Sequence, residues 1–233
     1  RYVVLTAVAR DDLADHGAGK SYLGFILYDL FLQPRGMGQV FGVETRPELV
    51  QRSQELAARL GFTGMHFLQL SAADAVSTEA LPQRIDMVTA LHACDTATDD
   101  AIVLARRLGA RLCAVAPCCQ AELAAELRKQ KARSPNLLAN EDASMTSPAL
   151  TEMWRHPLHT REFGSHLTNV LRCLQLESHG YDVTVTELVG WEHSMKNELI
   201  IATQKNLPGQ KAQERKTKLL AEIGLSSLEE RFA

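Results

Sequence analysis

The sequence predicts an α/β fold in which helices alternate with the strands of a mostly parallel sheet. Short apolar runs typical of buried strands alternate along the chain with stretches whose apolar residues recur at helical spacing. A strand, a helix and a second strand in this order are joined by a right-handed crossover, which keeps the two strands parallel. A chain of 233 residues is long enough for one such domain with an insertion.

The first half of the chain shows this alternation most clearly. We expect, in chain order, the end of a strand at Asp12–Asp15, a helix at Ser21–Leu32, a strand at Val40–Glu44, a helix at Pro47–Leu60, and strands at Met65–Leu70 and Ile85–Leu91. Leu23, Ile26 and Leu30 fall on one face of the first helix. Pro47 suits the first turn of the second helix, and Gly61 is a typical C-terminal stop.

The second half continues the pattern with one interruption. We expect a helix at Thr98–Leu108, a strand at Arg111–Ala116, helices at Ala121–Gln130 and Leu167–His179, and strands at Tyr181–Val189 and Leu199–Thr203. Residues from about 131 to 166 hold Pro, Ser, Asn and Thr with no clear period, so we expect an insertion there. The prediction is one domain over residues 1–204 and a polar tail over 205–233, with a solvated helix around Lys218–Ile223.

Composition and charge limit the classes of function. No apolar run approaches the roughly 20 residues that a membrane helix needs. The net charge of −3 lends no support to extensive phosphate binding, so any basic surface must be local. Five cysteines, an odd number with two of them adjacent, indicate a reducing, cytoplasmic compartment and not a disulfide framework. Because there is no CxxC pair, we expect no structural metal site.

A glycine-containing segment, Asp15-His16-Gly17-Ala18-Gly19-Lys20-Ser21, precedes the first predicted helix. Glycines let the backbone approach a ligand closely, and a helix start offers free N–H groups. Three ligands suit such a segment: a nucleoside triphosphate, a dinucleotide or S-adenosylmethionine.

Two of these ligands match poorly. A P-loop ending in Gly19-Lys20-Ser21 needs its first glycine at position 14, which is Ala14, and Asp15 would add a like charge to the phosphate cradle. A dinucleotide fingerprint needs a third glycine where Tyr22 stands, and that bulky side chain would hinder close packing of helix on strand.

Glu44, at the end of the second strand, favours the remaining ligand. Parallel-sheet geometry puts that strand end beside the glycine segment. A carboxylate there can accept hydrogen bonds from both hydroxyls of a ribose. Together with Asp15, this pattern favours S-adenosylmethionine binding. The alternative is a solvated strand-end glutamate and a glycine segment that only turns the chain.

The sequence also resembles class I S-adenosylmethionine-dependent methyltransferases. The closest resemblance is to a subgroup of bacterial methyltransferases related to the methyltransferase domain of glutathione S-transferase C-terminal domain-containing protein. Four segments carry the resemblance: Asp15–Leu23, Leu91–Asp99, Ala116–Gln120 and Glu192–Asn197. The two middle segments are distinctive, whereas the glycine segment is generic and has Ala18 where the subgroup often has cysteine.

The resemblance implies a Rossmann-like, seven-stranded sheet in the order 3-2-1-4-5-7-6, with strand 7 antiparallel. It also implies that S-adenosylmethionine is held by residues of the glycine segment and by residues at the strand ends, namely Asp15, Gly17, Gly19, Lys20, Glu44, Ser71, Ala72, Leu91 and His92. Where the family often has an aspartate near the adenine amine, this chain has Ser71, with Ala72 next and Asp74 displaced.

Three candidate catalytic residues follow the fourth strand: His92, Cys94 and Asp95. Ligands of doubly wound sheets sit at the carboxyl ends of the strands. His92 is a candidate base, and Asp95 is a candidate to accept a hydrogen bond from an N–H or O–H group of the methyl acceptor. The alternative role for Asp95 is to cap the helix that follows.

Two adjacent cysteines, Cys118 and Cys119, follow the fifth strand. A cysteine nucleophile occurs in cytosine-C5 methyltransferases, but there the motif follows the fourth strand. Buried free cysteines are more often small core residues.

The methyl acceptor is expected to be RNA, because the insertion gathers aromatic and basic side chains: Trp154, Arg155, His156, His159, Arg161 and His166. His193 and Asn197, between the last two strands, are further candidate acceptor contacts. The alternatives are an ordinary solvated loop, a protein or small-molecule acceptor, and a non-catalytic cofactor-binding scaffold.

Overall fold

The computed structural model describes residues 2–6, 21–91, 96–117, 121–133, 152–153, 155–188 and 197–233. The chain divides into two compact units. Unit 1 consists of Arg1–Cys118 and Thr184–Gln204, and unit 2 of Cys119–Val183 and Lys205–Ala233.

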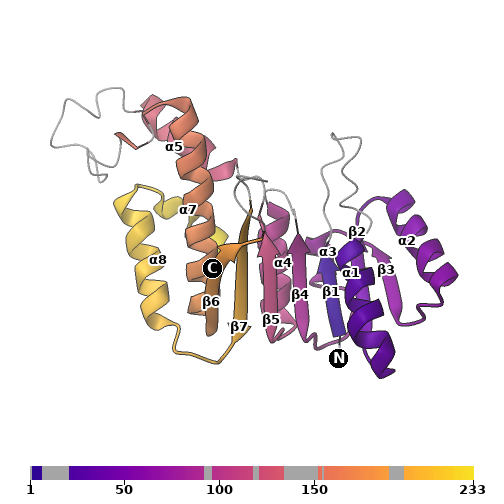
Figure 1. Ribbon diagram of the computed structural model, residues 1–233. Helices are drawn as coiled ribbons and strands as arrows, with labels where there is room; N and C mark the ends of the chain where they lie inside the picture. Colours follow the sequence, from indigo (N-terminus) through magenta and orange to yellow (C-terminus); the bar gives the residue numbers. More distant parts are fainter. Residues whose placement is uncertain are drawn as a thin grey trace. The chain divides into compact units, whose positions relative to one another are not determined.

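Within the described residues, seven strands form one sheet in the order β3-β2-β1-β4-β5-β7-β6 (Figure 1). The strands are β1 Tyr2–Thr6, β2 Gln39–Glu44, β3 Met65–Gln69, β4 Met87–Leu91, β5 Leu112–Ala116, β6 Tyr181–Glu187 and β7 Glu198–Gln204. Strands β1 to β5 pair in parallel, and β7 runs antiparallel to β5. The predicted α/β, Rossmann-like class is confirmed, and the strand order agrees with the one that the resemblance implies.

The first strand differs from the prediction. We expected its end at Asp12–Asp15, but the strand that pairs with β2 and β4 is Tyr2–Thr6. The run Tyr-Val-Val-Leu-Thr is rich in β-branched residues, which favour a strand, whereas three of residues 10–15 are aspartates, which disfavour one. Residues 7–20 lie outside the described part of the chain.

The helices of unit 1 agree with the predicted positions, apart from the short helix α3, which was not predicted. They are α1 Tyr22–Leu27, continued by a π-helical turn at Tyr28–Leu32 and a 3-10 turn at Gln33–Arg35, then α2 Pro47–Leu60, α3 Ala72–Ala75 and α4 Thr96–Arg107. Pro47 occupies the first turn of α2, and Gly61 ends it with φ +69°, a left-handed conformation that glycine adopts without strain. Figure 1 shows α1 in front of the sheet and α4 behind it.

An aromatic core joins α1 and α2 to one face of the sheet. It contains Phe25, Tyr28, Val40, Val50, Ala57, Phe62, Met65 and Phe67. The Tyr28 hydroxyl accepts a hydrogen bond from the Gly64 N–H at 3.0 Å, just before β3. A Cβ at Gly64 would lie 2.7 Å from the Tyr28 ring, so this contact requires glycine. Full burial of each large apolar side chain contributes about 1.5–3 kcal/mol to folding.

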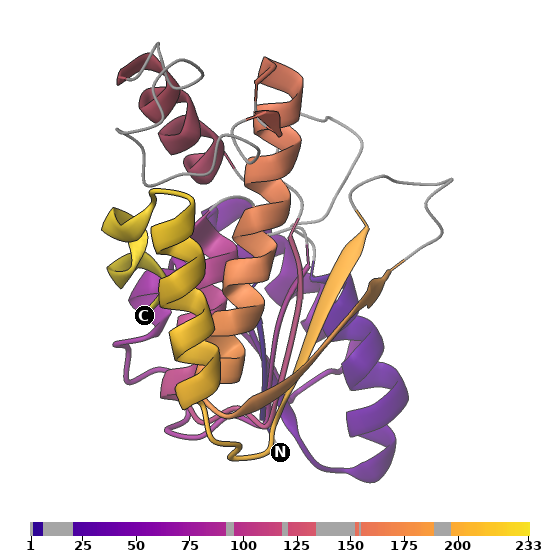
Figure 2. The same ribbon diagram turned by 90° about the vertical axis from the view of Figure 1, so that its left-hand side faces the viewer.

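Unit 2 is built mainly from helices. These are α5 Glu122–Arg133, α7 Pro157–Ser178 and α8 Gln210–Glu222, followed by 3-10 turns at Ser226–Leu228 and Glu230–Phe232. Their shared core contains Leu123, Leu127, Leu167, Leu171, Leu220, Ile223, Leu225 and Phe232. Figure 2 shows α7 and α8 side by side. A Cβ at Gly164 would lie 2.7 Å from the Ala124 backbone nitrogen, so α7 crosses α5 closely at that glycine.

Two predictions about unit 2 were wrong. Helix α7 begins at Pro157 and not at Leu167, so the irregular stretch is shorter than the expected 131–166. Thr160 and Gly164, which face the core in the early turns, are not apolar, and they hid the helical period. Residues 205–233 also do not form a solvated tail. Lys216 is fully buried and donates to the Phe232 carbonyl oxygen, and this lysine interrupts the apolar stripe that would have revealed α8.

None of the described helices is both long enough and apolar enough to cross a membrane.

Candidate functional site

The five parallel strands of unit 1 end at one edge of the sheet, here called the carboxyl edge. The register pairs Glu44 with Gln69 and Leu91 with Ala116, so neighbouring strands end level with one another. From β1 the order runs to β2 and β3 in one direction and to β4 and β5 in the other. Ligands of doubly wound sheets bind outside the carboxyl ends of the strands at such a reversal.

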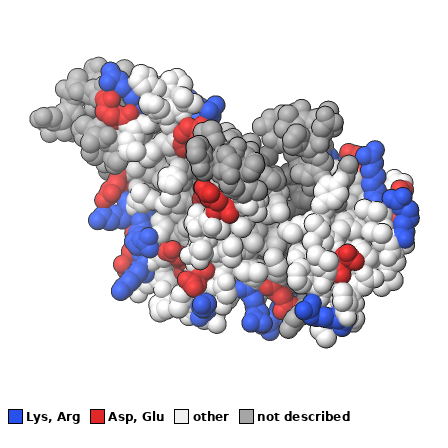
Figure 3. All heavy atoms as spheres, viewed as in Figure 1, with Lys and Arg blue, Asp and Glu red and all other residues white. Residues whose placement is uncertain are grey.

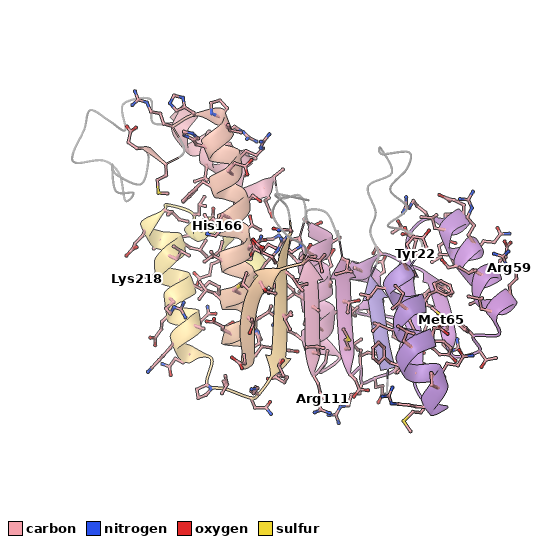
Figure 4. The ribbon with its side chains drawn as sticks, viewed as in Figure 1. Tyr22, Arg59, Met65, Arg111, His166 and Lys218 are labelled. Carbon is pink, nitrogen blue, oxygen red and sulfur yellow. The ribbon has the colours of Figure 1, made fainter. Side chains whose placement is uncertain are left out.

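The labelled side chains in Figure 4 help to locate this edge. Tyr22 marks the start of α1 near the carboxyl edge, and Arg111 marks the opposite edge, before β5. Residues 7–21 connect β1, the middle one of the five parallel strands, to α1, and their sequence contains the glycine segment.

The residues predicted to form the site fall into two groups. Most lie outside the described residues: Asp15, Gly17, Gly19, Lys20, His92, Cys94, Asp95, Cys118, Cys119, Trp154 and His193. Glu44, Ser71, Ala72 and Leu91 are described, and the structure brings them together at the carboxyl edge, at or directly after the ends of β2, β3 and β4.

Glu44 is the most constrained polar side chain among these. It is the last residue of β2 and is only 7% exposed. Its Oε1 accepts from the backbone N–H of Arg46 at 3.1 Å, from Arg46 Nε at 3.1 Å and from the Thr45 hydroxyl at 3.3 Å. Its Oε2 accepts from Arg46 Nη2 at 3.2 Å. The carboxylate therefore has one fixed orientation.

The protonation of Glu44 reflects two opposing effects. Burial raises the pKa of the carboxyl above its ordinary value, while the hydrogen bonds from the Arg46 N–H and from Thr45 act to lower the pKa. Burial is the larger effect. A buried carboxylate of this kind can accept hydrogen bonds from hydroxyl groups of a ligand, because among the described residues Oε2 accepts only from Arg46.

Ser71 caps α3 directly after β3. Its hydroxyl oxygen accepts from the Asp74 N–H at 3.0 Å, and the hydroxyl donates to Asp74 Oδ2 at 2.6 Å. The Ser71 hydroxyl is thus engaged in the cap, and Ala72 behind it is buried. The hydrogen bond from the Ser71 hydroxyl fixes the carboxylate of Asp74, so Ser71 and Asp74 form one rigid turn after β3.

Sequence reasoning missed Ser21 and Gly42. Ser21 is buried, with φ +51°, at the start of α1. A Cβ at Gly42 would lie 3.4 Å from the Ser21 hydroxyl oxygen and 2.6 Å from the Phe67 ring. Gly42 therefore lets Phe67 and the start of α1 lie close to β2, two residues before Glu44. The glycine was visible in the sequence, but its neighbours were not.

Buried polar residues also occur at the start of α4. Thr98 and Asp99 lie in its first turns, and Thr89 lies in β4, and all three are at most 2% exposed. An acidic residue in a first turn is stabilised by the helix dipole. The run of aspartates and threonines from Asp95 to Asp100 was the available signal, and it was interpreted only as a cap at Asp95.

In unit 2, the predicted acceptor residues that are described lie on the exposed side of the start of α7. Arg155 and Glu152 form an ion pair with Nη1 3.2 Å from Oε2, and Arg161 and Glu162 form one with Nη2 2.8 Å from Oε1. All four side chains are about half exposed or more. Figure 3 shows basic and acidic side chains interspersed on the face that it draws, with no broad basic surface among the described residues.

The histidines of the same segment are also exposed. The His156 and His159 rings meet edge to face, with their centroids 5.4 Å apart, and His166 lies two turns beyond His159. Asn197, the other described candidate, follows residues 189–196 and accepts a hydrogen bond from the Leu188 N–H through its carbonyl at 2.7 Å. Among the described residues, no group of three or more His, Cys, Asp or Glu could hold a metal ion.

A comparison with protein families identifies the class of this fold. A family model described as a methyltransferase domain matches residues 3–126, which is more than half of the chain and spans β1 to α5. The chain belongs to this methyltransferase family. The methyltransferase takes its methyl group from S-adenosylmethionine, which is therefore its cofactor.

Solved structures with a similar fold include an rRNA methylase, a pre-rRNA processing protein and a putative O-methyltransferase. An rRNA methylase from Streptococcus thermophilus is 8% identical, with 88% of this chain and 87% of that chain covered and a TM-score of 0.44. The fibrillarin pre-rRNA processing protein from Methanococcus jannaschii is 12% identical, with 88% and 67% covered and a TM-score of 0.47. A putative O-methyltransferase from Klebsiella pneumoniae is 12% identical, with 87% and 72% covered and a TM-score of 0.49. Likeness at this level says nothing about the acceptor of the methyltransferase.

No curated protein sequence matches the methyltransferase.

The described residues of the methyltransferase fit its cofactor. A buried carboxylate with spare acceptor capacity stands at the end of β2, beside the strand that precedes the glycine segment. An adenosyl group presents two ribose hydroxyls, and Oε2, which accepts only from Arg46 among the described residues, can accept from a hydroxyl donor.

Proposed function

We propose that the methyltransferase holds S-adenosylmethionine at the carboxyl edge of unit 1 through Glu44 and transfers the methyl group to RNA. The remaining proposed cofactor contacts are Asp15, Gly17, Gly19, Lys20, Ser71, Ala72, Leu91 and His92. The observation that carries the proposal is the buried Glu44 carboxylate at the strand end next to the reversal of strand order. The chain is further proposed to belong to the subgroup related to glutathione S-transferase C-terminal domain-containing protein.

The chemistry divides between the cofactor and the chain. When bound, S-adenosylmethionine supplies a methyl group on a positively charged sulfur. Glu44 binds the ribose, and its fixed orientation reduces the entropy lost on binding. His92, Cys94 and Asp95 come shortly after Leu91, the last residue of β4, in the sequence and are the proposed catalytic residues, with His92 as the base for an acceptor proton.

The RNA acceptor is supported by the exposed start of α7. Exposed imidazole rings can stack on unpaired bases, and His156, His159 and His166 are all exposed. Arg155 and Arg161 add guanidinium groups for phosphates, but each already faces a glutamate. We therefore expect few phosphate contacts and a shallow dependence of RNA affinity on salt.

A protein or small-molecule acceptor is the second candidate. It is favoured by the same ion pairs, because Glu152 and Glu162 reduce the positive charge available to RNA. A purely scaffolding role is not retained, since the chain belongs to an enzyme family.

The donor half is tested by isothermal titration with S-adenosylmethionine and S-adenosylhomocysteine. We expect both to bind the intact protein, and absence of binding would overturn the proposal.

The acceptor half is tested by incubating the protein and cofactor with cell extract. We expect S-adenosylhomocysteine to be released, and we expect ribonuclease treatment of the extract to abolish the release. Release that survives ribonuclease but is lost after protease treatment, or after removal of small molecules, would replace RNA by the corresponding acceptor.

A further inference from the structure

We propose that Arg46 is a positioning residue that makes the carboxyl edge distinguish between the two hydroxyls of a ribose. The inference rests on the proposed function, in which Glu44 binds the ribose. Arg46 acts by holding Glu44 so that, with the donors of the described residues in place, only the carboxylate oxygen Oε2 keeps the capacity to accept from the ligand.

The contacts of Arg46 show how it holds the carboxylate. Its guanidinium makes two contacts with the Glu44 carboxylate, with Nε 3.1 Å from Oε1 and Nη2 3.2 Å from Oε2. Its own backbone N–H adds a third bond to Oε1 at 3.1 Å. A two-point contact from a planar guanidinium sets both the position and the plane of a carboxylate, which a lysine ammonium cannot do.

The backbone of Arg46 is itself fixed. Arg46 precedes α2 with extended φ and ψ, and its carbonyl accepts from the N–H groups of Leu49 and Val50 at 3.2 Å. Pro47 follows at the first helical turn and restricts Arg46 to extended conformations. Helix α2 thus anchors Arg46, and Arg46 anchors Glu44.

The two oxygens of Glu44 differ in what remains free. Oε1 has donors from the Arg46 backbone, from Arg46 Nε and from Thr45, which fill its acceptor capacity. Oε2 has the single donor Arg46 Nη2 among those described. A ribose diol offers two hydroxyls, but only one oxygen can receive a strong, charge-assisted bond from them. One hydroxyl should therefore contribute much more affinity than the other.

The side chains are placed for this role and not for a surface ion pair. The Glu44 side chain is 8% exposed and the Arg46 side chain 20% exposed, so solvent screens their interaction weakly. Burial raises the pKa of Glu44 and lowers the pKa of Arg46, and the nearby carboxylate of Glu48 acts to raise the pKa of both groups.

The test uses the intact protein and measures dissociation constants for S-adenosylhomocysteine and for its 2′-deoxy and 3′-deoxy forms. For the unaltered protein we expect one deoxy form to bind roughly ten-fold or more weakly than the parent and the other to bind within about three-fold of it. In Arg46→Ala, affinity for the parent should fall about ten-fold, and the two deoxy forms should become alike within about two-fold. Arg46→Lys keeps the charge without the two-point contact and should also lose the discrimination. Arg59→Ala removes an exposed arginine from helix α2, which follows Arg46, and should change neither quantity.

The outcomes separate the two proposals. Equal loss with both deoxy forms in the unaltered protein, or full discrimination in Arg46→Ala and Arg46→Lys, overturns the positioning role while leaving cofactor binding intact. No binding of the parent compound by the unaltered protein overturns the proposed function as well. If Arg46→Ala does not fold, as judged by circular dichroism, Arg46→Lys decides.

Discussion

The carboxyl edge of unit 1 and the start of α7 in unit 2 carry their polar side chains in two different ways. At the carboxyl edge, Glu44 is buried and bonded to Arg46, and Ser71 is engaged with Asp74. At the start of α7, the arginines form ion pairs whose members are about half exposed or more. Exposed pairs of this kind contribute about 0–1 kcal/mol and rearrange easily. The difference teaches that the polar groups at the proposed cofactor side are held in fixed positions, whereas those at the proposed acceptor side are not.

The largest expected effect tests whether the two units can be perturbed separately. Phe232 is fully buried in the core of unit 2, so Phe232→Ala should lower the free energy of unfolding by about 3–5 kcal/mol. Urea unfolding measures this loss. Below the transition, affinity for S-adenosylmethionine should change less than about two-fold, since the carboxyl edge lies in unit 1. A large loss of affinity in the folded variant would show that the comparison between the units is wrong.

Glu44→Ala should have the opposite effect to Phe232→Ala, because it should act mainly on the affinity for S-adenosylmethionine. Removing the charged acceptor of a ribose hydroxyl costs about 1.5–3 kcal/mol of binding free energy, or roughly 10–150-fold in affinity for S-adenosylmethionine. Glu48→Ala, an exposed carboxylate four residues away, is the matched control and should bind normally. Calorimetry measures the affinity of both variants. Equal affinity of Glu44→Ala and the control would show that Glu44 only ends β2 and does not bind the cofactor.

Gly42→Ala tests the packing beneath the edge. Its Cβ would meet the Phe67 ring at 2.6 Å, and overpacking of a buried site typically costs about 1–3 kcal/mol. Gly109→Ala is the control, because a Cβ there has no neighbour within 4 Å and only its left-handed φ of +62° is unfavourable. Thermal unfolding should show the larger loss for Gly42→Ala, and a smaller loss than the control would contradict the close packing of Phe67 on β2.

The smallest effect concerns pH. Burial raises the pKa of Glu44, so the carboxyl takes up a proton at a higher pH than an ordinary glutamate. The protonated form loses the charge that strengthens the bond to a ribose hydroxyl. Affinity for S-adenosylmethionine should therefore be highest above the raised pKa and fall as the pH is lowered through it. Measuring the affinity for S-adenosylmethionine from about pH 7.5 to about pH 5 checks this. The groups that act on the Glu44 carboxyl are Thr45, Arg46 and Glu48. Glu44→Gln is the control, because it has no carboxyl to titrate at this position. If affinity is as independent of pH in the unaltered protein as in Glu44→Gln, the prediction is contradicted.

The features that the sequence predicted well depend on local signals. Helix α2 lies where Pro47 and Gly61 predicted it, because a proline and a left-handed glycine act on the backbone around them. Glu44 was correctly expected at a strand end for the same reason: the apolar run before it is short and continuous.

The features that the sequence did not predict depend on neighbours distant in the chain. The early turns of α7 are buried at Thr160 and Gly164, and Gly164 packs against Ala124 of α5, a neighbour that its own residue type does not reveal. Lys216 is buried because the Phe232 carbonyl is available to it, which no spacing rule reveals. The bond from Glu44 to Arg46 joins residues two apart, but it requires the turn between β2 and α2 to be known first.

Hydrogen exchange of the intact protein with and without S-adenosylhomocysteine tests the central claim most directly. The account predicts slower exchange in the peptide that holds the end of β2 and the start of α2, residues 42–50, and little change over α7 at Pro157–Ser178. Slower exchange over α7 with no change over residues 42–50 would contradict the placement of the cofactor at the carboxyl edge of unit 1.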